Sequence, residues 1–322
     1  MRVGRRARGL RGLGVAMSAT APALALAGCE LAEVVIAEPE DVVVAEVLVQ
    51  VRPDDFDGGP LVFALLHGTG DRGSGVPGAR IVIHHEDHAV TLHESANLTD
   101  CLWSAPPGYA SNCYRASFAD ERSFRPGDAL RVDIDLPGGG RLEGVTRVPG
   151  DFRFTQFPAG QGGSKLCGLQ PDTTLELRWT SSQGAWAYVG EAGINGLRAP
   201  MAARGIELSE DYHYLLGLAV SARDTTIVFP TEFGLLDRFG PDSELLVALQ
   251  GGLPSNVRAR VGVTAVDRNY VNWARGGNFN PSGLVRVPSL RGEGTGFFGA
   301  AVLRELTVLV QPNELGEAPP CR

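Results

Sequence analysis

Short runs of apolar residues, broken by glycine, proline and acidic turns, recur along the whole chain and predict β-strands. Residues 42–51 and 61–66 are rich in β-branched side chains, which favour strands. Residues 79–84 and 89–93 flank a polar turn and predict a hairpin. A second hairpin is predicted where residues 130–136 and 141–148 flank the turn Pro-Gly-Gly-Gly.

The second half continues the same pattern with few helical signals. Further strands are predicted at residues 173–179, 186–189, 212–221, 245–249, 257–266 and 298–310, and short helices at 231–239 and 267–275. Short strands with glycine and proline turns indicate an all-β fold, which we interpret as two immunoglobulin-like or transthyretin-like β-sandwiches in tandem. The expected divisions are a leader at 1–28, a tether at 29–40, sandwiches at 41–155 and 165–312, and a tail at 313–322, with the domain boundary near the glycines at 160–163.

The first 29 residues have the pattern of a secretion signal. Five arginines precede a weakly apolar run that ends in small residues. The ending Leu26-Ala27-Gly28-Cys29 resembles the lipobox of bacterial lipoproteins. That resemblance implies a signal peptide at 1–28 and acylation of Cys29, which would hold the protein on a membrane through lipid. An ordinary secretory signal with an unrelated cysteine is the alternative.

Charge and length narrow the classes of partner. The 322 residues carry a formal charge of -8, and removal of the five leader arginines lowers it to -13. A strongly acidic body argues against nucleic acid and anionic lipid surfaces as partners, since both select basic patches. Beyond the leader no apolar run approaches the roughly 18 residues that a membrane-spanning helix needs.

With Cys29 assigned to lipid, four cysteines remain, and an even number in an exported protein indicates disulfides. Four cysteines allow three connectivities. Cys101 and Cys113 enclose a short loop, which favours their pairing and leaves Cys167 for Cys321. Metal binding is the rival interpretation, but no Cys-x-x-Cys spacing supports it.

Four segments together resemble the DUF4249 family of bacterial envelope lipoproteins. They are residues 77–83 with 90–94, residues 124–134, Val148-Pro149, and residues 279–282 with 292–300. Leu130 stands where the family usually has an aromatic residue, and the expected asparagine near Ser289 is absent, so the chain resembles a divergent member. The family has no assigned activity. Its members are often encoded beside TonB-dependent outer-membrane receptors, which implies an accessory role at the outer membrane.

Residues with catalytic or metal-binding chemistry are few. His84 and His88, with His93 nearby, are of metal-ligand type, but they flank a hairpin turn where exposed polar residues are common. Asp133 and Asp135 share one strand face, which we interpret as solvated surface rather than a catalytic pair. Two matches to Gly-x-Gly-x-x-Gly, at 68–73 and 294–299, lack the following helix of a dinucleotide site. No cofactor is expected.

Aromatic residues concentrate in the second half, where they pack in a core or form a binding surface. Tyr270 and Trp273, three apart on a predicted surface helix, are the candidate binding residues. We therefore expect an outer-membrane lipoprotein that binds or assists a TonB-dependent receptor and is not an enzyme. Two alternatives stay open: a structural or adhesive surface protein, and an envelope hydrolase with an unrecognised site. The sequence leaves open whether the body faces the periplasm or the cell exterior.

Overall fold

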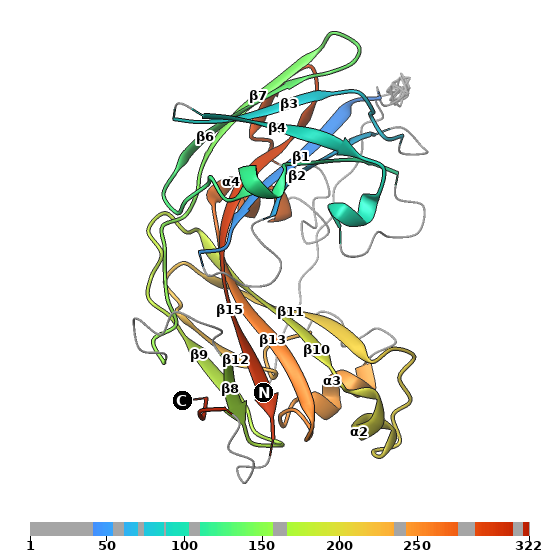
Figure 1. Cartoon of the computed structure of the whole chain (residues 1–322), viewed down its shortest axis with the longest axis vertical. Helices are drawn as coiled ribbons and strands as arrows, with labels where there is room; N and C mark the ends of the chain where they lie inside the picture. The colour runs from blue at the N-terminus through green and yellow to red at the C-terminus, as the bar shows by residue number, and fades with distance from the viewer. Residues whose placement is uncertain are drawn as a thin grey trace, which may run out of the picture. The chain divides into compact units, whose positions relative to one another are not determined.

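The computed structural model describes residues 41–53, 61–69, 74–86, 88–102, 110–156, 166–234, 243–275, 287–311 and 318–321. Strands dominate these segments, and the helices are few and short (Figure 1). The all-β prediction is therefore confirmed. The predicted leader, the lipidation site Cys29, the tether and the glycine-rich boundary lie outside the described residues.

Two layers of strands form the N-terminal half. The strands are β1 (Val43–Val51), β2 (Leu61–Gly68), β3 (Arg80–His85), β4 (His88–Ser95), β5 (Asn112–Arg115), β6 (Ala129–Asp135) and β7 (Arg141–Arg147). They follow the order β1-β2-β5-β4-β3-β6-β7. Val47 and Ala64 from β1 and β2 pack in one buried cluster with Ile83 and Val132 from β3 and β6. Both predicted hairpins, β3–β4 and β6–β7, are present.

The C-terminal half is also a sandwich. Its strands are β8 (Leu166–Leu169), β9 (Leu175–Arg178), β10 (Ala187–Asn195), β11 (Tyr212–Ser221), β12 (Thr226–Phe229), β13 (Val257–Val266) and β15 (Thr295–Val310). The short β14 (Leu290–Gly292) lies in the same part of the sequence but joins the N-terminal strands. Strands β11, β10, β13 and β15 lie side by side, and β8 pairs with β15 (Figure 1). A two-stranded sheet of β9 and β12 contributes Leu177 and Ile227 to the core cluster, where Val261 of β13 also packs.

Strand β15 belongs to the pairing of both halves. Its residues Thr295–Val302 pair in parallel with β1, whereas its residues 301–310 pair with β13. The short β14 pairs with β7. Strand pairing therefore crosses the division predicted near residues 160–163. Gly296, with φ of 137°, allows the close approach of the β15 and β1 backbones, because a Cβ there would lie 1.9 Å from the Ala45 carbonyl oxygen.

The helices correct part of the prediction. They are η1 (Leu98–Asp100), α1 (Phe118–Glu121), α2 (Arg198–Ala202), α3 (Ser243–Leu249) and α4 (Arg268–Arg275). The predicted helix at 267–275 is α4. The strand predicted at 245–249 is wrong, since α3 covers it. Its buried Leu245, Leu246 and Leu249 lie one and four apart, a helical spacing that a short apolar run does not reveal. Residues 231–234, predicted as helix, form a turn instead.

Both predicted disulfides are present. Cys101 is bonded to Cys113, and Cys167 on β8 is bonded to Cys321. The second bond holds the end of the chain against β8, where the Cys321 amide also donates to the Gly168 carbonyl at 2.9 Å. Among the residues that the structure describes, no helix has both the length and the apolar character that crossing a membrane requires.

Candidate functional site

The two predicted binding residues lie on α4 but do not form an exposed pair. Trp273 is only 7% exposed: its ring stacks on Phe297 with centroids 5.5 Å apart, and its Nε1 donates to Glu46 Oε1 at 2.8 Å. Tyr270 is half-buried and meets the same phenylalanine edge-on at 6.0 Å. The prediction of an exposed surface is wrong for Trp273, because α4 packs this side chain against β1 and β15.

A buried aspartate fixes the start of α4. Asp267 precedes the helix and accepts the backbone N–H of Tyr270 at 2.9 Å, as a helix-capping side chain does. Its other carboxylate oxygen accepts the Thr146 hydroxyl from β7. Burial raises the pKa of Asp267 above its usual value, although these hydrogen bonds oppose the shift. The position of Tyr270 relative to the sheet is thus set by a capped helix.

A second aromatic group, which the sequence did not single out, surrounds Glu191 on β10. Tyr214 of β11 donates its hydroxyl to Glu191 Oε2 at 2.9 Å, and Thr264 of β13 donates to Oε1 at 3.1 Å. The Tyr212 side chain covers Gly193, where an added Cβ would lie 2.5 Å from the phenol oxygen. We call Glu191, Tyr212, Tyr214, Thr264 and Tyr270 the Glu191 cluster.

The strand register explains why these side chains meet. Gly193 of β10 lies opposite Tyr214 and Glu191 lies opposite Leu216, so alternate residues of both strands share one sheet face. Because Gly193 has no side chain, it leaves room on β10 for the tyrosine side chains of the neighbouring strand β11. The face is open to solvent: Tyr214 is 44% exposed and Leu216 is 49% exposed.

The cluster is also coupled electrostatically. Desolvation raises the pKa of Tyr214 far above its usual value, and the Glu191 carboxylate raises it further by its charge and hydrogen bond. Desolvation likewise raises the pKa of Tyr270, with the charges of Glu191 and Glu46 adding to it. All three tyrosines therefore stay neutral at physiological pH, and Tyr214 is the one shown to donate its hydroxyl to Glu191.

Glu191 accepts hydrogen bonds from hydroxyl groups. Its described hydrogen bonds come from Tyr214 and Thr264. Arg260 lies opposite Gly193 on the neighbouring strand, and its charge lowers the pKa of Tyr212 against the dominant effect of desolvation.

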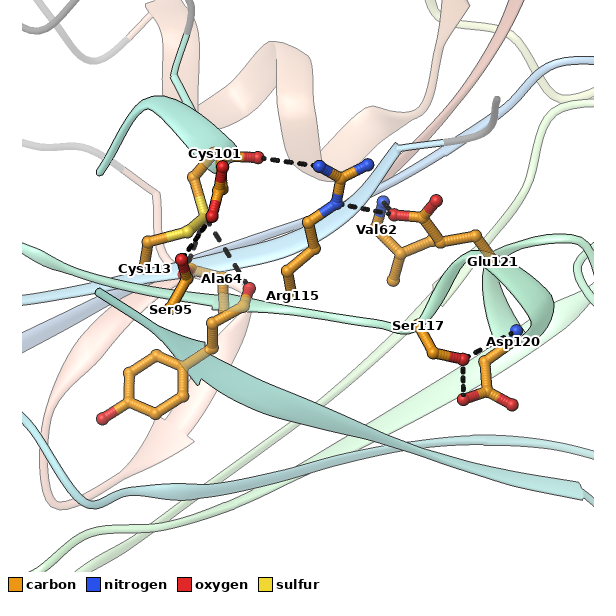
Figure 2. Close-up of polar contacts among 11 residues, drawn as sticks. Val62, Ala64, Ser95, Cys101, Cys113, Arg115, Ser117, Asp120 and Glu121 are labelled. Atoms are coloured by element: carbon orange, nitrogen blue, oxygen red, sulfur yellow. Dashed lines mark hydrogen bonds and ion pairs between the residues drawn. A yellow bond between two sulfur atoms is a disulfide. The ribbon is translucent and has the colours of Figure 1, made fainter. Parts of the chain in front are cut away.

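A contrasting carboxylate is buried in the N-terminal half (Figure 2). Glu121 of α1 is 0% exposed. Its Oε1 accepts the Val62 backbone N–H at 3.3 Å and Arg115 Nε at 3.1 Å, while Oε2 has no hydrogen-bond partner. Arg115 also reaches the carbonyl of Asp100, beside the Cys101–Cys113 disulfide. This contact set ties α1 to β2 and β5 and explains the acid as a structural anchor.

The histidines do not converge. His84 Nε2 lies 2.8 Å from Asp133 Oδ2, and the buried His85 Nε2 lies 3.1 Å from Asp128 Oδ2. His88 and His93 are exposed on β4, five residues apart along the chain. In the part of the chain that the structure describes, no three histidine, cysteine, aspartate or glutamate residues gather as metal ligands. His84 thus belongs to a network of polar contacts around Asp133.

That network corrects the prediction of a solvated surface for Asp133 but not for Asp135. Asp133 is 7% exposed, not solvated, and Arg131 and Arg141 contact it at 3.0 and 2.8 Å. Desolvation opposes its ionisation, but the Arg141 hydrogen bond and the arginine charges outweigh this and lower its pKa. Asp135 is exposed and pairs with Arg80 at 3.2 Å. Each aspartate has a structural partner.

Comparisons with known proteins do not assign the chain to a family. No family model and no curated protein matches the chain. Among solved structures, the fibronectin(III)-like modules of Clostridium thermocellum CbhA are 11% identical, with 84% of this chain and 93% of that chain covered and a TM-score of 0.21. Extracellular cadherin domains 3–6 of protocadherin gamma B2 are 10% identical, with 84% of this chain but only 51% of that chain covered and a TM-score of 0.15. TM-scores this low support no inference about fold or function.

Proposed function

We propose that the protein is a lipid-anchored binding protein of the bacterial cell envelope, with the Glu191 cluster as its binding surface. The observation that carries this proposal is an exposed aromatic side chain, Tyr214, held by a carboxylate on a sheet face. Aromatic rings supply large contact area at low conformational cost, and strands position them more firmly than loops do. This surface replaces the predicted pair on α4, of which only Tyr270 takes part.

The envelope location rests on the leader. Cys29 follows the lipobox-like Leu-Ala-Gly, and two disulfides in the body fit an oxidising compartment. Resemblance to envelope lipoproteins extends the proposal to the outer membrane and to a TonB-dependent receptor as the partner that the protein assists. The acidic charge of the body is compatible with a protein partner and unfavourable for nucleic acid.

The anchor is tested by expressing the full chain in a diderm bacterium fed an alkyne-labelled palmitate. The wild type is expected in the outer-membrane fraction with the label attached, whereas Cys29→Ser is expected unlabelled and soluble in the envelope. Label retained on Cys29→Ser, or an unlabelled wild type, would contradict lipid anchoring.

The partner is tested by cross-linking in cells, stringent purification of the anchored protein and identification of captured proteins. A β-barrel receptor is expected with the wild type and with Phe118→Ala, a control that removes another exposed aromatic side chain. Absence of any such receptor from the wild-type sample would refute the accessory role.

A further inference from the structure

We propose that the Glu191 cluster binds a neutral carbohydrate, with the Tyr214 ring as the stacking platform and Glu191 as the principal hydrogen-bond acceptor. The proposal rests on the proposed binding function and names the class of ligand for that same surface. It is carried by the geometry of the ring, the unused hydrogen-bonding capacity of the cluster and the mixed charge around it.

The Tyr214 ring is oriented before any ligand arrives. Its hydroxyl is held by Glu191 at 2.9 Å, yet the side chain keeps 44% of its surface exposed. A side chain already fixed at one end loses little rotamer freedom on binding. The apolar face of a sugar ring, with its outward C–H groups, matches such an exposed aromatic face, whereas the sugar hydroxyls need polar partners around it.

Those polar partners are present beside the ring. An ionised carboxylate offers about four acceptor sites, and the hydroxyls of Tyr214 and Thr264 occupy two of those on Glu191. The Tyr270 hydroxyl makes no hydrogen bond to another described residue, and the charges of Glu191 and Glu46 both act on it. A ligand hydroxyl both donates and accepts, so it can donate to Glu191 and accept from Tyr270.

The surrounding charges favour a neutral ligand over a charged one. Glu191 and Glu46 disfavour an anion. An organic cation would suit tyrosines around a carboxylate, but Arg260 lies on the same face, opposite Gly193, and acts electrostatically on Tyr212. A neutral polyhydroxylated ligand avoids both penalties and uses the carboxylate and the phenols together.

The test uses purified full-length protein in detergent on an array of neutral hexasaccharides of glucose, xylose, mannose and N-acetylglucosamine. Choline and glucuronic acid serve as charged probes. Binding to at least one neutral series is expected, followed by calorimetric titration of that sugar. Tyr214→Ala and Glu191→Gln are each expected to weaken binding by about 10-fold or more, since each removes the ring or a charged hydrogen-bond acceptor.

Controls separate a lost site from a lost fold. Phe118→Ala and Arg178→Ala alter exposed side chains outside the cluster and are expected to bind the sugar as the wild type does. Tyr214→Phe keeps the ring and is expected to retain more affinity than Tyr214→Ala. Thermal unfolding midpoints of all variants, measured alongside, show that the affinities belong to folded protein.

Three results would overturn the proposal. They are no neutral sugar bound on the array, sugar binding that survives both Tyr214→Ala and Glu191→Gln, and binding of choline or glucuronic acid alone. Receptor capture reports separately on the proposed function. A captured receptor without sugar binding rejects the carbohydrate alone, whereas sugar binding without a receptor rejects the accessory role and supports the carbohydrate site.

Discussion

Glu121 and Glu191 are two shielded carboxylates in the two halves of one protein, and their partners differ. Glu121 is fully buried and is held by an arginine and a backbone N–H. Glu191 lies on a sheet face, where two hydroxyl groups contact it and an exposed tyrosine stands beside it. The first arrangement joins secondary-structure elements. The second leaves acceptor capacity and an aromatic surface facing outward.

The two carboxylates illustrate how the partners of an acid in a β-sandwich indicate its role. When an acid inside the core is paired with a cation, removal of the cation destabilises the fold, because an unpaired charge remains in a region of low polarity. An acid surrounded by hydroxyl groups at a surface contributes little to folding and can exchange a partner for a ligand. Three substitutions test this contrast by stability, from the largest expected effect to the smallest.

Arg115→Met is expected to have the largest effect. It leaves Glu121 fully buried with the Val62 N–H as its remaining partner, and breaking a buried pair in this way costs about 3 kcal/mol of unfolding free energy. Urea denaturation at neutral pH, with both disulfides intact, measures the loss. The double variant Arg115→Met/Glu121→Gln is expected to recover part of it, and an unchanged midpoint for the single variant would show that the pair is not structural.

Asp133→Asn tests an intermediate case, a poorly exposed acid with exposed cation partners. The folded pKa of Asp133 is lowered below its usual 3.8. The ionised form therefore contributes stability above that pH, and the contribution is lost as pH falls through the folded pKa. A loss of about 1 kcal/mol is expected at neutral pH. The variant should also lose less stability than the wild type on acidification, and parallel acid-unfolding curves would refute this role.

Glu191→Gln is expected to have the smallest effect at neutral pH, below about 1 kcal/mol. Its distinguishing effect on stability is expected at alkaline pH. The pKa values of Tyr212, Tyr214 and Tyr270 are raised above 10.0 in the folded state, so their contribution to stability is present below that pH and is lost as pH rises above it. Replacing Glu191 by glutamine removes one negative charge that raises these tyrosine pKa values.

Stability measured from pH 8 to 11 (roughly the range around the ordinary tyrosine pKa) should therefore fall less steeply for Glu191→Gln than for the wild type. Tyrosinate absorbance should appear at lower pH in the variant. Identical titrations for the two proteins would remove Glu191 from the tyrosine environment.

Much of the fold was predictable because local patterns determine it. The hairpins β3–β4 and β6–β7 follow from alternating residues around turn sequences. The two disulfides follow from the even number of cysteines and the short loop between Cys101 and Cys113. The helix α3 was not predictable from its short leucine-rich run, since such a run is compatible with either a strand or a buried helix.

The candidate site was predictable only in part, because long-range register creates it. Of the two residues predicted on α4, Tyr270 lies near Glu191, whereas Trp273 is buried by the packing of α4 on residues from opposite ends of the chain, Glu46 and Phe297. The pairing of Gly193 with Tyr214 brings Glu191 among the tyrosines. No local pattern encodes that register. The aromatic pair Tyr212 and Tyr214, two apart on a strand, was the one available signal.

Strand β15 also determines the order in which the protein can fold. Val44 of β1 pairs with Thr295, so the N-terminal sandwich completes its sheet only after residues 295–302 have been synthesised. Contacts this distant in sequence form slowly. Until then β1, a run of valine and leucine with one acid, presents an unpaired edge that invites association with other chains. Fragments that end before β15 should consequently aggregate, even though strands β1 to β7 are all included.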